Sequence, residues 1–113
     1  MKKPMEKDVL ASCLRLLRLA GVFAWRNNSG GTYLPGHGER KQFVRFGLVG
    51  SSDILAVLPP GGKLLACECK RPGGKPNAFQ VAFLDAVTTA GGLAVVVSDV
   101  KQLEQVLKLE GVL

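Results

Sequence analysis

The stretch GLVGSSDILAVLPPGGKLLACECK, residues 47–70, decides how the rest of this chain is interpreted. Residues 51–58 and 63–70 are short runs rich in Ile, Leu and Val, and the Pro-Pro-Gly-Gly segment between them is typical of a tight turn. The pattern therefore predicts an antiparallel hairpin whose side chains point alternately to its two faces.

The turn also predicts the register of this hairpin. An even-numbered loop centred between Pro60 and Gly61 pairs residues whose numbers sum to 121, which places Asp53 opposite Glu68 on the same face. Directly opposed side chains have Cβ atoms about 5 Å apart, and like charges there destabilise a sheet. A divalent cation with oxygen ligands would compensate them. An odd-length loop or a bulge would instead move Glu68 to the other face.

Lys70 lies two residues beyond Glu68 on the same face, so the hairpin predicts two carboxylates for a metal with an ammonium group beside them. A Glu-x-Lys pattern by itself more often marks a solvated strand face. Here Asp53 interrupts an apolar strand and Glu68 ends a core strand, and both features favour a functional site.

Asp53, followed by Glu68-Cys69-Lys70 at the end of the next strand, resembles the active site of the PD-(D/E)xK nuclease superfamily. The surrounding residues resemble one branch, the virus-type replication-repair nuclease (VRR-NUC) domain, and the resemblance covers nearly the whole chain. The Asp and Glu-x-Lys alone are weakly specific, whereas the ordered set is much more so. The further residues of that set are Glu6, the Arg26-Asn27-Asn28-Ser29-Gly30 segment, Gly50-Ser51-Ser52 and Gln80.

This resemblance implies an α/β fold with a restriction-endonuclease-like core, in which helices flank a mixed central sheet in the order α-β-β-β-α-β-α. It implies that Asp53, Glu68 and the backbone carbonyl of Cys69 bind magnesium or manganese, and that Lys70 orients the nucleophile or stabilises the developing charge. Glu6 and Gln80 would assist them, although a carboxylate at the position of Glu6 is also favoured by the helix N-terminus.

The resemblance also implies a substrate and an assembly. Stand-alone members of the branch resemble small phage and bacterial enzymes that cut branched DNA, including four-way junctions, as homodimers. We therefore expect a homodimeric DNA endonuclease of this kind, because symmetric cutting of two strands needs two sites. A nuclease acting on linear duplex or single-stranded DNA, a non-catalytic nucleic-acid-binding domain with the same fold, and a basic structural protein are the alternatives.

Length and composition predict one intracellular domain spanning residues 1–113. The apolar content of 47% suits a globular fold, and no apolar run is long enough to predict a membrane span or a signal peptide. The odd cysteine count favours reduced thiols in the cytoplasm. We interpret Cys13, Cys67 and Cys69 as small buried hydrophobic residues, the alternative being a zinc site shared with His37.

The net charge of +6 favours an anionic partner, for which nucleic acid is the usual candidate. Residues 28–39 are interpreted as a Gly-rich polar loop without the Gly-Lys-Ser/Thr ending of a nucleotide-binding loop, so no small-molecule cofactor is expected. Basic and aromatic residues near this loop suit phosphate contacts and base stacking. The expected nucleic-acid contacts are Arg26, Asn28, Arg40, Lys41, Arg45, Arg71 and Lys75.

Periodicity and end signals predict helices at residues 5–20, 78–89 and 100–109, with Asn77 as the N-cap of the second. Phe79 and Phe83 are expected on the core face of that helix. Further strands are predicted at residues 22–27, 42–46 and 93–97. Residues 42–46 are expected to join the hairpin in a meander with Phe46 in the core, and residues 93–97 to be buried on both faces.

Overall fold

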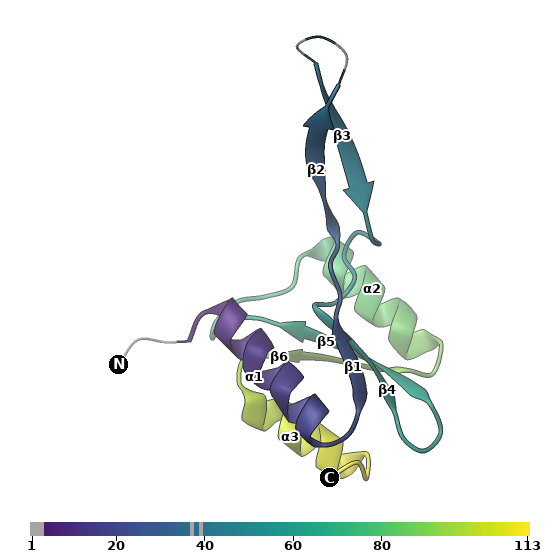
Figure 1. The fold of residues 1–113 in the computed structure, drawn as a ribbon. Helices are drawn as coiled ribbons and strands as arrows, with labels where there is room; N and C mark the ends of the chain where they lie inside the picture. Colours follow the sequence, from purple (N-terminus) through teal and green to yellow (C-terminus); the bar gives the residue numbers. More distant parts are fainter. Residues whose placement is uncertain (1–3, 37, 39) are drawn as a thin grey trace.

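The computed structural model describes residues 4–36, 38 and 40–113, and it shows a mixed α/β fold (Figure 1). The helices are α1 (Glu6–Leu19), α2 (Ala78–Thr89) and α3 (Val100–Leu109). The strands are β1 (Phe23–Arg26), β2 (Gly30–Pro35), β3 (Lys41–Phe46), β4 (Ile54–Leu58), β5 (Lys63–Cys69) and β6 (Leu93–Val97). No helix among the described residues is long and apolar enough to cross a membrane.

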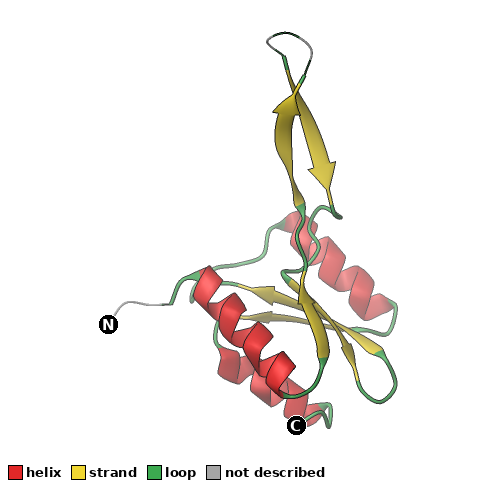
Figure 2. Cartoon of the chain, in the orientation of Figure 1, coloured by secondary structure: helices red, strands yellow, loops and turns green. Residues whose placement is uncertain are grey.

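Four strands form the central sheet in the order β1-β4-β5-β6. The first three are antiparallel neighbours, and β6 runs parallel to β5 after the crossover through α2. Helices α1 and α3 lie on one face of this sheet and α2 lies on the other (Figure 2). The sheet is therefore mixed and flanked by helices, as the sequence predicts.

The register of the β4–β5 hairpin agrees with its prediction. Ile54 pairs with Cys67 and Leu58 pairs with Lys63, which leaves a four-residue turn of two prolines and two glycines. Alternate residues of β4 and β5 consequently face the two helical layers. Asp53 and Glu68 lie one step beyond the Ile54–Cys67 pair, at the end of the hairpin opposite the turn.

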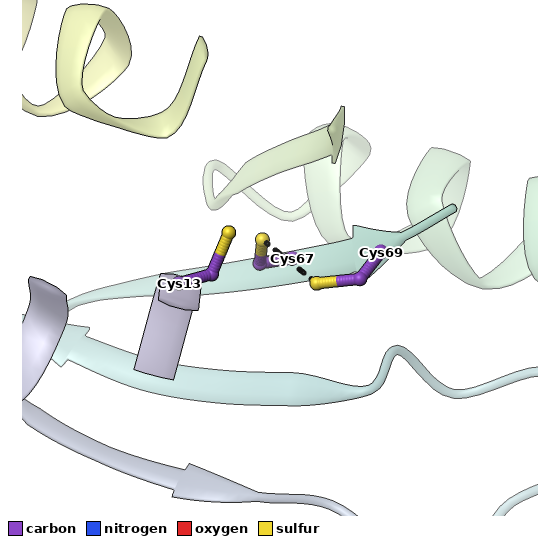
Figure 3. Close-up of side chains that lie close together, drawn as sticks. All are labelled: Cys13, Cys67 and Cys69. Atoms are coloured by element: carbon purple, nitrogen blue, oxygen red, sulfur yellow. Dashed lines mark hydrogen bonds between the residues drawn. The ribbon is translucent and has the colours of Figure 1, made fainter. Parts of the chain in front are cut away.

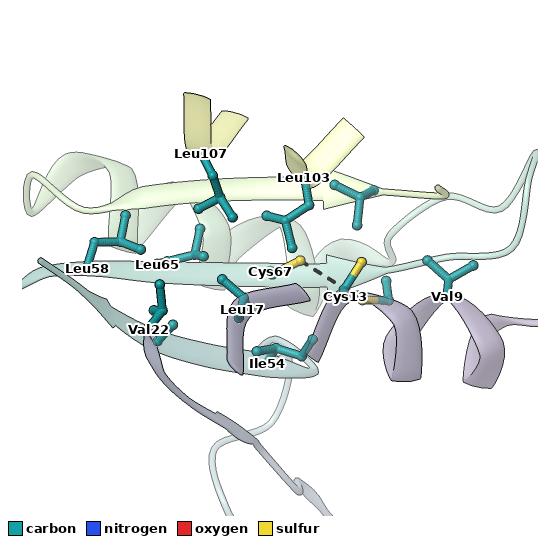
Figure 4. Close-up of a cluster of buried hydrophobic side chains, with 13 residues drawn as sticks. Val9, Cys13, Leu17, Val22, Ile54, Leu58, Leu65, Cys67, Leu103 and Leu107 are labelled. Atoms are coloured by element: carbon teal, nitrogen blue, oxygen red, sulfur yellow. Dashed lines mark hydrogen bonds between the residues drawn. The ribbon is translucent and has the colours of Figure 1, made fainter. Parts of the chain in front are cut away.

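The larger core lies between the sheet and the α1–α3 layer (Figure 4). Leu17 of α1 and Leu103 and Leu107 of α3 are fully buried there against Ile54 and Leu65 of the sheet. The core under α2 is much smaller, because it contains only Ala66, Leu84 and Val87 as buried residues of the described chain. Most of the apolar burial therefore lies on the side away from Glu68.

Local signals place the helix ends within one residue of their predictions. Asn77 caps α2, since its side chain accepts a hydrogen bond from the Gln80 amide at 2.9 Å. The predicted core face of α2 is only partly correct, however: Phe83 packs against the small core, but Phe79 is 66% exposed, and Leu84 and Val87 are the buried residues. Because α2 is apolar on nearly all sides, its sequence pattern does not determine which side packs on the sheet.

The Gly-rich segment is wrongly predicted as a loop. Residues 30–35 form β2, which pairs with β3 from Gly30–Phe46 to Pro35–Lys41 and makes a separate two-stranded sheet. This hairpin, called the arm below, projects from the body of the protein (Figure 1). The predicted pairing of residues 42–46 with the central hairpin is therefore wrong, Phe46 is 46% exposed instead of buried, and the chain has two more strands than the expected order.

Strand β6 also differs from its prediction. Its residues are mostly half-buried because it lies at the edge of the sheet and one of its sides has no partner strand. A run of five apolar residues predicts a buried strand, but such a run carries no information about the position of the strand in the sheet order.

We expect Leu17→Ala to lower the free energy of unfolding by about 2–5 kcal/mol, because Leu17 is fully buried between α1, α3 and the sheet. Leu19→Ala in the same helix is the matched control, since Leu19 is 76% exposed and its truncation should change stability by less than about 0.5 kcal/mol. Urea denaturation measures both values. Equal losses in the two variants would contradict the described orientation of α1.

Candidate active site

Two carboxylates meet at the open end of the β4–β5 hairpin. Asp53 immediately precedes β4 and its Oδ2 accepts a hydrogen bond from the Cys69 amide at 2.9 Å, while Glu68 lies on β5 and is 1% exposed. Carboxylate oxygens of Glu6, Asp53 and Glu68 lie within 4.8 Å of one another. Three acidic groups from α1, the start of β4 and the end of β5 therefore converge on one point.

A lysine accompanies these carboxylates. The Lys70 Nζ atom lies 3.5 Å from Glu68 Oε1 and 4.0 Å from Glu6 Oε1, and only 12% of the Lys70 side chain is exposed. Glu6 itself is exposed on the first turn of its helix. Its first-turn position in α1 nevertheless brings its carboxylate to Lys70, so the structure gathers the predicted Glu6, Asp53, Glu68 and Lys70 together.

Gln80 makes three hydrogen bonds, one of which links α2 to this group. Its Oε1 accepts from the Asn77 amide at 2.8 Å, its own amide donates to Asn77 Oδ1, and its Nε2 donates to Glu68 Oε1 at 3.0 Å. The side chain that completes the cap of α2 thus also orients the Glu68 carboxylate. The sequence indicates an inward direction for Gln80, and the structure adds the partner.

The structure also identifies Asn27 as a positioning residue that sequence reasoning treated only as part of a motif. Its Nδ2 donates to Ser51 Oγ at 2.7 Å and to the Ser52 carbonyl at 3.0 Å, and its amide donates to the Asp53 carbonyl at 2.7 Å. These bonds tie the end of β1 to the three residues that enter β4. The signal in the sequence was a polar residue at the end of the strand predicted at residues 22–27.

Burial and the neighbouring Asp53 charge raise the pKa of Glu68 to about 7, although the Lys70 ammonium acts in the opposite direction. Burial is the larger cause, because a carboxylate that loses contact with water favours its neutral form. Glu68 is therefore only partly ionised at neutral pH in the absence of a further positive charge.

The donor set suits a divalent cation. Glu68 Oε1 already binds Gln80 and Lys70, whereas Glu68 Oε2 is buried and has no hydrogen-bond partner. Buried polar atoms are nearly always paired, so a partnerless carboxylate oxygen beside Asp53 fits a metal ligand. Magnesium and manganese prefer oxygen ligands of this kind. The Cys69 carbonyl fits as well, because the amide of that strand residue points to Asp53 and its carbonyl points to the same edge.

The predicted nucleic-acid contacts are all exposed but fall into separate groups. Arg71 and Lys75 lie in the connection that leaves β5 directly after Lys70, and Arg71, together with Pro4, Met5 and Gly73, lines a hollow of about 370 Å³. Arg26 and Asn28 lie at the end of β1. Arg40, Lys41 and Arg45 belong to the arm: Arg40 directly precedes β3, Lys41 is its first residue, and Arg45 lies near its other end.

The three cysteines lie on the opposite face of β5 from Glu68 and are fully buried, as expected for small core residues. Their sulfur atoms lie within 4.8 Å of one another, and Cys67 Sγ is 4.0 Å from Cys69 Sγ (Figure 3). Hydrogen bonds with Cys13 and Cys69, together with burial, raise the pKa of the Cys67 thiol. Protonated thiols fit an apolar core, and His37, which the alternative zinc site would include, lies outside the described residues.

Comparisons with known proteins give no match: no protein-family model matches the chain, and no curated protein matches it. The function proposed below therefore depends on the geometry of the site.

We expect the metal-free protein to lose stability as the pH rises from about 5 to 8. Folded Glu68, with its pKa of about 7 against an ordinary value of 4.5, keeps a proton that the unfolded chain has released. The folded state therefore binds more protons in this window, and the free energy of unfolding should fall by up to about 3 kcal/mol across it. Urea denaturation in chelator at several pH values measures this slope.

Glu68→Gln is the matched variant, because it preserves the size of the side chain and an oxygen that accepts from Gln80. It should be nearly insensitive to pH over the same window. An identical slope in the two proteins would show that another group titrates and would contradict the described burial of Glu68.

We expect Asn27→Ala to weaken divalent-metal binding, because the loop that carries Asp53 loses two side-chain hydrogen bonds. The readout is the rise in melting temperature produced by manganese, which should be clearly smaller than in the unmodified protein at the same concentration. Asn28→Ala is the control, since Asn28 is the exposed neighbour. Equal manganese responses in both variants would remove Asn27 from the positioning role.

Proposed function

We propose that this chain is a divalent-metal-dependent DNA endonuclease that hydrolyses phosphodiester bonds, with a preference for branched DNA such as four-way junctions. The observation that carries the proposal is the convergence of three carboxylates within 4.8 Å beside the Lys70 ammonium. The motif resembles that of the PD-(D/E)xK superfamily and its VRR-NUC branch, and the mixed sheet with its antiparallel β1-β4-β5 part and parallel β6 is compatible with that fold.

In this proposal Asp53, Glu68 and the Cys69 carbonyl hold magnesium or manganese, and Glu6 approaches from α1. A bound ion of this kind acidifies and positions a water molecule and neutralises charge on a phosphate. Lys70 supplies a fixed positive charge at the same point, which suits either the attacking oxygen or the developing charge on the scissile phosphate. Gln80 and Asn27 act as positioning residues, because they fix Glu68 and Asp53 through hydrogen bonds.

Exposed basic residues support DNA as the substrate. Arg71 and Lys75 closely follow Lys70 in the chain, so a phosphate backbone bound by them would lie near the end of β5 that carries Glu68. The net charge of +6 favours such an approach at low salt. Two sites are required to cut two strands symmetrically, so we include a homodimer in the proposal.

The test compares cleavage of a labelled four-way junction by the unmodified protein, Lys70→Ala and Lys63→Ala, in magnesium, manganese and chelator. Lys63 is the matched control: it lies at the other end of β5, is bonded to Glu110, and its removal changes the net charge equally. We expect metal-dependent paired cuts, a loss of at least about 100-fold in Lys70→Ala, and nearly full activity in Lys63→Ala.

Other outcomes separate the alternatives. Undiminished cutting by Lys70→Ala would overturn the site assignment. Equal cutting of linear DNA duplexes that carry the same sequences would support a nuclease but reject the preference for junctions. Tight binding without cutting in either metal would identify a non-catalytic nucleic-acid-binding domain.

A further inference from the structure

The arm is too exposed to be stable as an independent hairpin. Its strands β2 and β3 form a sheet of their own, and a two-stranded sheet without a covered face is marginally stable in water. All residues of β2 are exposed, and only Val44 of β3 is half-buried. The arm therefore needs a partner on at least one of its faces.

The strand pairing divides the arm into two chemically different faces, because paired residues point the same way and successive pairs alternate. One face, here the cationic face, contains Gly31, Tyr33, Pro35, Lys41, Phe43 and Arg45. The other, here the uncharged face, contains Gly30, Thr32, Leu34, Gln42, Val44 and Phe46.

The cationic face suits a nucleic acid. The rings of Tyr33 and Phe43 lie 5.0 Å apart, and the Arg45 guanidinium lies 5.6 Å from the centre of the Phe43 ring. Gly31 permits this arrangement, since a Cβ there would be 2.4 Å from the tip of the Phe43 ring. Exposed aromatic rings with adjacent cations can contact bases and phosphates.

The uncharged face suits a protein surface instead. Leu34 and Phe46 are 45% and 46% exposed, and Leu48 and Val49, which follow β3 in the chain, are exposed apolar residues as well. We propose that this face is the contact between two copies of the chain, each arm packing its uncharged face on that of its partner. The inference specifies the surface of the homodimer included in the proposed function and does not depend on the metal site.

The surface area of the chain supports a second copy as the occupant. Its accessible surface is 7680 Å², whereas a compact monomer of this size exposes about 6,000 Å². Its radius of gyration is 15.9 Å, against about 13 Å for a compact domain. The excess of about 1,700 Å² exceeds the roughly 800 Å² that each partner buries in a standard interface.

Charge also favours self-association through this face. Each chain carries a net charge of +6, so two copies repel each other wherever their basic residues meet. The six residues of the uncharged face carry no formal charge, whereas the cationic face would place Lys41 and Arg45 against their own counterparts. Of the two faces of the arm, the uncharged face is therefore the one that favours an isologous contact, which leaves the cationic face free for DNA.

The test measures molecular mass by sedimentation at about 5 and 50 μM, in chelator and without DNA. We expect a dimer for the unmodified protein and for Tyr33→Ser. Leu34→Ser and Phe46→Ser should raise the dimer dissociation constant at least tenfold. Tyr33 and Leu34 are adjacent on β2 but point to opposite faces, and loss of Tyr33 removes the aromatic pair of the hairpin itself. A specific effect at Leu34 thus reports the contact and not hairpin stability.

A second control tests the competing apolar surface on the body. Phe23 of β1 is 69% exposed, and Phe23→Ser should remain dimeric. A monomeric unmodified protein, equal dissociation of Tyr33→Ser and Leu34→Ser, or dissociation of Phe23→Ser alone would overturn the inference. The manganese-induced rise in melting temperature, measured on Leu34→Ser, separates loss of the dimer from loss of the fold. If manganese does not raise the melting temperature of the unmodified dimer, the metal site is refuted but the proposed interface is not.

Discussion

The arrangement of this protein depends on a buried carboxylate, Glu68, that faces a second carboxylate, Asp53, across the β4–β5 hairpin. Burial and like charge both oppose ionisation of Glu68. Contacts from Lys70 and Gln80 to Glu68 Oε1 offset part of this cost of ionisation, whereas Glu68 Oε2 has no hydrogen-bond partner. A site with these properties is stable when protonated, and it becomes stable in its charged form when a cation is bound.

The two faces of β5 differ: one packs into the large core, and the other carries the Glu68 carboxylate. Leu65, Cys67 and Cys69 point into the large core under α1 and α3, which anchors the strand. Ala66 and Glu68 point to the other face, where the core is small and α2 contributes Gln80 as well as packing. The strand that carries this carboxylate is thus anchored by apolar contacts on its opposite side, while few apolar groups pack on the side of Glu68 itself.

Much of this site could be predicted because its residues are close in sequence. The Pro-Pro-Gly-Gly turn determines the register, and the register determines that Asp53 meets Glu68. The arm could not be predicted in the same way, because the Gly-rich β2 has weak strand propensity and forms only through pairing with β3. The side of α2 that packs and the edge position of β6 also depend on distant residues, to which local apolar patterns are insensitive.

The register of the arm determines which residues share each of its faces. Because Lys41 and Arg45 both belong to β3, a shift of one position would keep them on one face but would bring Leu34 beside them in place of Tyr33. The Tyr33 ring would then lie on the face of Phe46, away from Phe43 and Arg45. Gly31 opposes such a shift, since the Phe43 ring lies where a side chain would otherwise project. The absence of a Cβ at this position therefore helps to keep Tyr33 and Phe43 together on the cationic face and Leu34 on the uncharged face.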